Sequence, residues 1–197
     1  MNQLERCILD GAISAQEKYE KMSGGCWLSH GPESFLQIVI AELLSERTEL
    51  PIYVDASIKK MMREFERGPG RPSKPNAQRP DITVFHKDET LRAAIEVKRA
   101  WSFHPIRKDA KKIQDYLSGR NAAKIGYIIV YSDTANIVPT REQQMEAAFR
   151  RWKKNLGPKW SLIAPHVVRG ANDGGIWGLA LFRYDYRSPT RRDLGEI

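Results

Sequence analysis

Two short strings of residues in this chain have the types and spacing of a phosphodiester-cleaving site. Asp81 is followed 15 positions later by Glu96, and Lys98 comes two residues after Glu96. Two carboxylates can share one divalent cation, and an adjacent lysine can hold a water molecule or a phosphate group. We therefore predict metal-dependent phosphodiester hydrolysis, with these three residues as catalytic residues.

The expected strand register brings the three side chains together. Residues 80–86 and 91–101 are predicted strands, and the four polar residues between them form a turn. A hairpin centred on that turn pairs positions whose numbers sum to 177. Asp81 then faces Glu96, with Cβ atoms roughly 5 Å apart. Glu96 and Lys98 project from the same face of their strand.

The predicted cofactor is Mg²⁺, for which Mn²⁺ is expected to substitute. Mg²⁺ prefers oxygen ligands and keeps several waters, so Asp81, Glu96 and the backbone carbonyl of Val97 are the predicted protein ligands. The cation would lower the pKa of a water and stabilise the charge on the phosphoryl group. Without a cation the two carboxylates repel each other, so their pairing itself favours a metal or a neutralising lysine.

A surface cluster of ion pairs is the alternative interpretation, because acid-x-lysine is a common sequence. Over residues 93–98, however, apolar positions alternate with a small residue and then the two charged ones. One face of the strand is therefore apolar and the other carries the charges. Pro80 begins the preceding strand, where its missing N–H costs least. These features favour a catalytic site.

The remaining sequence predicts an α/β domain around this hairpin. A strand, a basic helix and a nearly continuous apolar strand follow one another over residues 91–131, which favours a parallel crossover. Predicted helices cover residues 3–22, 32–47, 57–67, 105–117 and 140–155, and further predicted strands cover 50–54, 125–131, 160–168 and 176–184.

Residues 68–79 predict a flexible basic loop just before Asp81. The segment contains three prolines, two glycines and three basic residues, with almost nothing to bury. Because its C-terminal end must lie beside Asp81, we expect a basic flap over the substrate groove. A plain linker is the alternative.

Length and composition indicate one domain, residues 1–197. With 41% hydrophobic residues in 197, the chain can bury a full core. No apolar run approaches the roughly 18 residues of a membrane span, and Glu5 and Asp10 interrupt any signal-peptide segment. Cys7 and Cys26 are expected to be free thiols in the cytoplasm.

The net charge of +8 is unevenly distributed along the chain. Residues 1–57 hold four Lys/Arg against nine Asp/Glu, or −5, and residues 58–197 hold 28 against 15, or +13. Ordinary solubility charge is one explanation. Beside an acidic site, a basic body of this size favours a nucleic-acid partner.

The combination of Pro80-Asp81 with Glu96-Val97-Lys98, followed by a helix and a buried strand, resembles the PD-(D/E)xK nuclease superfamily. The resemblance covers about residues 30–135. It implies a restriction-endonuclease-like central mixed β-sheet flanked by helices, and Mg²⁺-dependent cleavage, usually of DNA. It also implies a glutamate on the helix before the motif, a position that Glu33 occupies, with Gln37 completing a helix pattern of several branches.

Helical geometry gives partial support for Glu33 as a third carboxylate. Glu33 and Gln37 are four residues apart, on one edge of the apolar face of their helix. Glu42 lies on the opposite edge and is the competing candidate. Glu33 also lies in the first turn, where a capping or dipole role is the alternative.

Several polar residues are candidates for contacting the substrate. A solvated charged face is the alternative for the basic helix, and His104, Trp101 and the arginines at 187, 191 and 192 are weaker candidates. For Trp101, stacking on a base competes with core packing, which is favoured. The predicted nucleic-acid-binding residues are Gln37, Arg79, Arg99, Lys108, Lys111 and Gln114.

The function predicted from the sequence is an Mg²⁺-dependent DNA endonuclease. A non-catalytic DNA-binding or assembly module of the same fold is one alternative, and an RNA-cleaving enzyme is another. The substrate structure and any recognised base sequence stay open. Enzymes of this size that cut duplexes often need a second active site, so a homodimer is one expectation.

Overall fold

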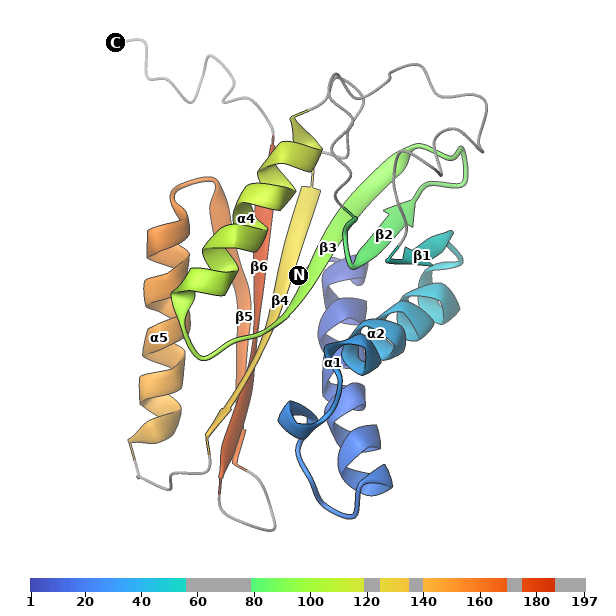
Figure 1. Cartoon of the computed structure of the whole chain (residues 1–197). Coiled ribbons are helices and arrows are strands. Elements are labelled where there is room, and N and C mark those ends of the chain that lie inside the picture. The colour runs from blue at the N-terminus through green and yellow to red at the C-terminus, as the bar shows by residue number, and fades with distance from the viewer. Residues whose placement is uncertain (56–78, 119–124, 135–139, 170–174, 187–197) are drawn as a thin grey trace, which may run out of the picture.

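The computed structural model describes residues 1–55, 79–118, 125–134, 140–169 and 175–186. These residues form an α/β fold in which a six-stranded mixed sheet lies between helices (Figure 1). The predicted helix at 57–67 and nearly all of the predicted loop at 68–79 fall outside the described residues, as do the arginines at 187, 191 and 192.

The sheet has the strand order β1-β2-β3-β4-β6-β5. β3 and β4 are parallel, as predicted for the crossover, and the other neighbouring pairs are antiparallel. The strands are β1 (Ile52–Val54), β2 (Ile82–Phe85), β3 (Leu91–Arg99), β4 (Ile125–Thr134), β5 (Trp160–Arg169) and β6 (Ile176–Asp185).

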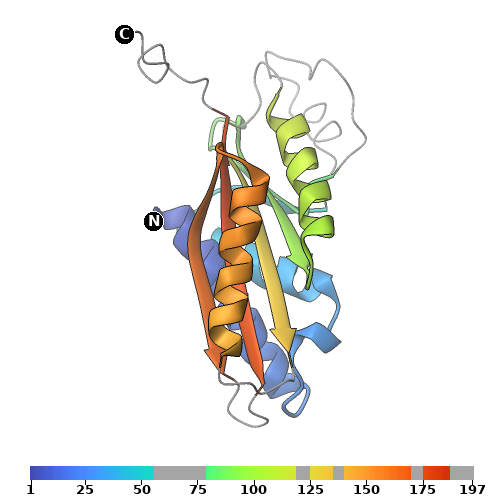
Figure 2. The same ribbon diagram turned by 90° about the vertical axis from the view of Figure 1, so that its left-hand side faces the viewer.

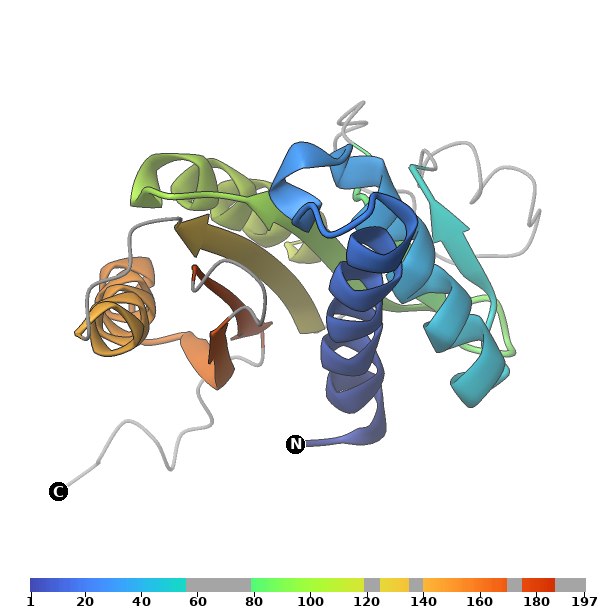
Figure 3. The same cartoon turned by 90° about the horizontal axis from the view of Figure 1, so that it is seen from below.

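Helices cover both faces of the sheet and bury two separate apolar cores. α1 and α2 pack on one face, and α4 and α5 pack on the other (Figures 2 and 3). A short 3-10 helix, η1, which the sequence did not predict, connects α1 to α2. The helices are α1 (Gln3–Met22), η1 (Leu28–His30), α2 (Glu33–Thr48), α4 (Phe103–Leu117) and α5 (Arg141–Leu156).

Two glycines allow helices to approach their neighbours closely. A Cβ atom on Gly11 of α1 would lie 2.9 Å from the Cα atom of Ile40 in α2. A Cβ atom on Gly126 of β4 would lie 2.2 Å from Cγ2 of Ile113 in α4. Both distances are too short for a side chain, so glycine sets the positions of α2 and α4, the two helices that carry site residues.

The hairpin register agrees with the sequence prediction over Ile82–Val84, and both strands are shorter than predicted. Ile82 pairs with Ile95, a sum of 177, but a bulge between Val84 and Phe85 shifts the register so that Phe85 pairs with Leu91. β2 begins at Ile82, one residue after Asp81, and β3 ends at Arg99, before Trp101. Asp81 therefore lies at the point where the β2–β3 ladder stops.

The two cysteines and the described helices can be compared with the predictions of free thiols and of no membrane span. Cys7 is buried and Cys26 is exposed, and both are free thiols. Among the described helices, none is both long and apolar enough to cross a membrane.

Candidate active site

Glu33 reaches β3 from the first turn of α2. Its Oε1 lies 3.2 Å from Nζ of Lys98, and its Oε2 accepts a hydrogen bond of 2.8 Å from the backbone N–H of Arg99. No side chain caps the start of α2 at Pro32. The carboxylate is therefore bonded to the neighbouring strand rather than to its own helix, which disfavours the capping alternative.

The competing glutamate on the same helix lies away from this group. Glu42 forms an ion pair of 2.9 Å with Lys18 of α1, and both side chains are about half exposed. Of the two candidates, the structure brings Glu33 and not Glu42 to Lys98.

Asp81 is held against β3 by a backbone hydrogen bond. Its Oδ2 accepts the N–H of Val97 at 2.7 Å, and its carbonyl oxygen accepts the N–H of Asp55 at 2.9 Å. The expected direct opposition to Glu96 within the ladder is not formed, because pairing ends at Ile82. Asp81 instead reaches the strand at Val97, next to Glu96 in the chain.

Glu96 is buried and only half satisfied. Its side chain is 1% exposed. Oε2 accepts a hydrogen bond of 3.0 Å from Nζ of Lys112, and Oε1 is buried with no hydrogen-bond partner. A buried carboxylate oxygen without a donor is costly, so it marks a place where a ligand could bind.

Two residues of α4, which the sequence analysis did not assign to the site, complete the group. Lys112 lies 3.1 Å from Oδ1 of Asp109, whose Oδ2 is 3.6 Å from Nζ of Lys98. Asp109 is buried, although it is an acid, because it occupies the helical face that also buries Ile106 and Ala110. An aspartate within an apolar helical stripe was the available sequence signal.

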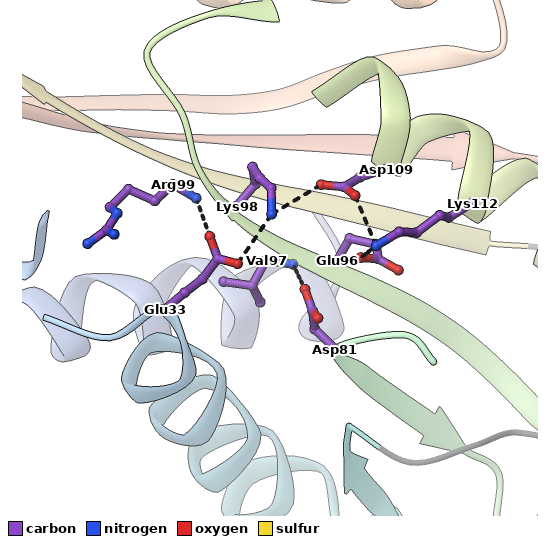
Figure 4. Close-up of polar contacts among 8 residues, drawn as sticks. All are labelled: Glu33, Asp81, Glu96, Val97, Lys98, Arg99, Asp109 and Lys112. Atoms are coloured by element: carbon purple, nitrogen blue, oxygen red, sulfur yellow. Dashed lines mark hydrogen bonds and ion pairs between the residues drawn. The ribbon is translucent and has the colours of Figure 1, made fainter. Parts of the chain in front are cut away.

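Five side chains form one connected group, and Asp81 joins it through the backbone N–H of Val97; we call the six residues the acid–lysine cluster (Figure 4). Ion pairs run without a break from Glu33 through Lys98, Asp109 and Lys112 to Glu96. With every group ionised, four carboxylates face two ammonium groups, which leaves a charge of −2. One divalent cation would neutralise that charge. The cluster consists of Glu33, Asp81, Glu96, Lys98, Asp109 and Lys112.

Burial disfavours charge on the two central carboxylates. Burial and then the charge of Asp81, opposed by Lys112, together raise the pKa of Glu96 to about 8. Burial also raises the pKa of Asp81 to about 6, against the hydrogen bond from Val97. An added positive charge nearby would therefore favour the ionised form of both carboxyl groups.

The pKa values of the two lysines are also raised, which for an ammonium group favours the charged form. Burial disfavours the ammonium form of Lys98, but the carboxylates of Asp109 and Glu33 outweigh it and raise the pKa of Lys98. Burial likewise opposes the charge on Lys112, and Glu96 and Asp109 outweigh it, so the pKa of Lys112 is raised. Both lysines are therefore cationic at neutral pH.

The donor set fits a cation that keeps most of its waters. In the part of the chain that the structure describes, no three His, Cys, Asp or Glu side chains converge as a metal-ligand group. Mg²⁺, however, is usually held by one or two carboxylates. Asp81 and the orphaned Oε1 of Glu96 supply two. The carbonyl of Val97 stays a predicted ligand.

Three predicted substrate-binding residues lie together on α4. Lys108, Lys111 and Gln114 line a hollow of about 830 Å³, to which Lys112 also contributes. Lys112 therefore connects this basic surface to the acid–lysine cluster. His104, a weaker candidate, lies at the same hollow.

The other three predicted substrate-binding residues are more scattered. Gln37 is partly buried one turn after Glu33, and Arg79 is exposed two residues before Asp81. Arg99 has a structural role, since its Nη1 donates to the carbonyl oxygens of Ser29 and Gly31. Any hydrogen bond from Arg99 to a substrate would therefore come from its other N–H groups.

Comparisons with known proteins do not supply a family for this chain. No family model, no curated protein and no solved structure matches it. A function can therefore be inferred only from the side chains of the acid–lysine cluster and from the strands and helices that bring them together.

Proposed function

We propose that this protein is a divalent-metal-dependent nuclease of restriction-endonuclease-like fold that hydrolyses phosphodiester bonds in DNA. One observation carries the proposal. The carboxylate of Asp81 binds the N–H of Val97, the residue that follows Glu96 in β3, and Lys98, next in the strand, bonds to Glu33 at 3.2 Å. Phosphodiester hydrolysis needs groups that stabilise the developing charge, activate a water molecule and fix a cation near the phosphate, and these residue types can supply all three.

Asp81 and Glu96 would hold Mg²⁺ or Mn²⁺, with the Val97 carbonyl as a further ligand. When bound, the cation would activate water and offset the charge that develops on the phosphoryl oxygens. The Val97 N–H fixes one oxygen of Asp81. Burial fixes Glu96 and leaves its Oε1 without a competing donor. Both carboxylates are therefore oriented before any cation arrives.

Lys98 is the proposed catalytic cation. An ammonium group has three donors, and in this structure Nζ has two carboxylate neighbours, Glu33 at 3.2 Å and Asp109 at 3.6 Å. A third donor is then available to hold the attacking water or a phosphate oxygen. Glu33 also binds the N–H of Arg99, so it acts as a positioning residue for this part of β3.

Lys112 is proposed to keep the empty site balanced. It bridges Glu96 and Asp109, and its side chain is 37% exposed. A divalent cation at Glu96 would replace part of this electrostatic stabilisation. The released ammonium group would then face the basic hollow along α4, where a phosphate could bind.

A second candidate function has one observation in its favour. The lysines already pair with three of the four carboxylates, so the cluster is partly neutralised without metal. In a non-catalytic DNA-binding or assembly module of this fold, these ion pairs would stabilise the fold, and no metal would be required. Absence of cleavage by folded protein would support that candidate.

The experiment is a substrate panel: supercoiled plasmid, linear duplex, single-stranded DNA and RNA, each with Mg²⁺, Mn²⁺ or EDTA. We expect DNA cleavage with either cation and none with EDTA. Glu33→Gln should reduce cleavage at least about tenfold, because a mispositioned catalytic group is costly. Glu42→Gln, on the same helix but outside the cluster, is the matched control and should cleave normally. RNA cleavage alone would contradict the DNA assignment.

A further inference from the structure

Trp101 is an exposed aromatic ring that is held in a fixed position. It is 59% exposed, and within the described ranges no other Trp, Tyr or Phe side chain is as open to solvent. The core packing favoured from the sequence is therefore wrong for this residue. β3 ends at Arg99, so Trp101 lies on the connection to α4 rather than in the sheet.

Two hydrogen bonds fix the edge of the indole ring, and the ring face away from Arg99 is the one offered to a ligand. Nε1 donates to Oδ1 of Asp133 at 2.9 Å and to the carbonyl oxygen of Asp133 at 3.0 Å. Asp133 belongs to β4 and is itself buried at 9% exposure. The polar atom of the side chain is thus satisfied by the sheet. What remains for a ligand is a rigid apolar plane.

A cation lies over the ring, and the Asp133 carboxylate lies at its edge. The guanidinium carbon of Arg99 lies 6.0 Å from the ring centroid. Arg99 is in turn anchored to the carbonyl oxygens of Ser29 and Gly31. On the other side in the chain, Phe103 and His104 begin the basic hollow along α4. An open ring between Arg99 and the basic hollow favours a polyanion that carries flat rings, which describes a nucleic acid.

The distance from Trp101 to the acid–lysine cluster suits one or two nucleotides. Trp101 is three positions after Lys98, which is at most about 10 Å along an extended chain. The N–H of Ala100 still donates to the Tyr131 carbonyl at 3.0 Å, so this segment continues along β4. A strand whose phosphate lies at Lys98 can therefore place a nearby base on the ring.

We propose that Trp101 is a stacking platform for an unpaired nucleobase beside the scissile phosphate. In an intact duplex both faces of a base are covered by its neighbours, so such a platform selects single strands, flaps, branches or frayed ends. The position of the cut rests on the proposed nuclease function. The binding of unpaired DNA does not, and it can be measured without metal.

A protein partner is the competing occupant for an exposed tryptophan. The other exposed large apolar side chains in the described part of the chain are Met1, Met22, Ile38 and Val54. None of them lies on β3 or α4, the two elements that flank Trp101 in the chain. A protein interface would more typically surround it with further apolar groups.

The test is binding in EDTA, where no cleavage interferes. Fluorescence anisotropy would compare a labelled single-stranded oligonucleotide with the same sequence as a blunt duplex. Trp101→Ala should weaken single-strand binding about 5- to 150-fold, the loss of one stacked base, and leave duplex binding within about twofold. Trp101→Phe should restore most of the loss, because a smaller ring still stacks.

Two further measurements separate stacking from folding. Thermal unfolding of each variant reports whether the fold is kept. Asp133→Asn keeps the ring but weakens its anchor, so it should give an intermediate loss of single-strand affinity. A 2-aminopurine in the oligonucleotide should be quenched by the wild-type protein and by Trp101→Phe, and not by Trp101→Ala.

The outcomes distinguish this inference from the proposed function. Equal losses for duplex and single strand, or no loss in folded Trp101→Ala, would overturn the stacking platform even if the protein cleaves DNA. Absence of DNA binding by the wild-type protein would overturn it as well. A selective loss of single-strand binding in a protein that never cleaves would support the platform and contradict the nuclease.

Discussion

Among single residues, Glu96 has the charge that is least balanced by its neighbours in the cluster. Its side chain is buried, it receives one hydrogen bond from Lys112, and its second oxygen receives none. Asp81 adds a like charge nearby. The folded protein without metal therefore favours the protonated form of Glu96 more strongly than the unfolded chain does.

This balance predicts a pH-dependent stability in EDTA. The pKa of Glu96 is about 8 in the folded state and 4.5 ordinarily, so ionisation costs stability as pH rises between these values. Below the lower value the group is protonated in both states and contributes nothing. Glu96→Gln should therefore gain stability over wild type as pH rises from about 5 to 8.

Urea unfolding at several pH values measures this difference, with Glu42→Gln as a control that should follow wild type. A difference between Glu96→Gln and wild type that stays constant with pH would contradict the burial argument.

Lys112 gives a second prediction at this scale. Lys112→Met removes the donor to Glu96 and the ion pair to Asp109, and should destabilise the metal-free protein by about 1–3 kcal/mol. Mg²⁺ should recover part of the loss, because it supplies charge where the ammonium group was. The rise in thermal unfolding temperature with Mg²⁺ should be larger for this variant than for wild type. Equal rises would show that metal and Lys112 do not share a site.

At the scale of elements, most of the helices and strands could be predicted because their periodic patterns are strong. The β2–β3 hairpin and its pairing over Ile82–Val84 could be predicted from the polar turn, but the bulge between Val84 and Phe85 could not. The contact of Asp81 with Val97 could not be predicted, because the point where the β2–β3 ladder stops depends on tertiary packing at β1 and β3. The approach of α4 to β3 was equally absent from the pattern, so Lys112 and Asp109 were missed.

Gly11 provides the prediction at the element scale. Alanine normally favours a helix over glycine by about 1 kcal/mol. At Gly11 the added Cβ would lie 2.9 Å from the Ile40 backbone, so α1 and α2 must separate. We expect Gly11→Ala to destabilise by about 1–3 kcal/mol in urea unfolding. Glu17→Ala, on an exposed position of the same helix, should change stability by less than about 0.5 kcal/mol. Unchanged or increased stability of Gly11→Ala would contradict the close packing.

At the scale of the whole molecule, charge distribution and site position are linked. The acidic N-terminal part supplies Glu33, and the basic remainder carries the hollow along α4. Net charge and its asymmetry were readable from the sequence. The spacing along one helix already suggested that Lys108, Lys111 and Gln114 lie together. The hollow that they line could be seen only in the folded structure.

Salt dependence tests this charge argument. Each phosphate contact that is lost should reduce the slope of log affinity against log salt by about 1. Lys111→Ala should therefore bind DNA more weakly and with a shallower slope than wild type. Lys21→Ala, at the end of α1, removes the same charge elsewhere and should keep the wild-type slope. Equal effects of both variants would mean that only net charge matters.

The central claim is that the acid–lysine cluster cleaves DNA with a divalent cation. Its most direct measurement is single-turnover cleavage of DNA by wild type, Asp81→Asn and Lys98→Met, with Mg²⁺ and with EDTA. Lys87→Met, in the β2–β3 turn and outside the cluster, is the control. We predict cleavage by wild type and Lys87→Met in Mg²⁺ alone, and a loss of at least about 100-fold in the two folded site variants. Undiminished cleavage by Asp81→Asn or Lys98→Met, or none by folded wild type with either Mg²⁺ or Mn²⁺, would contradict it.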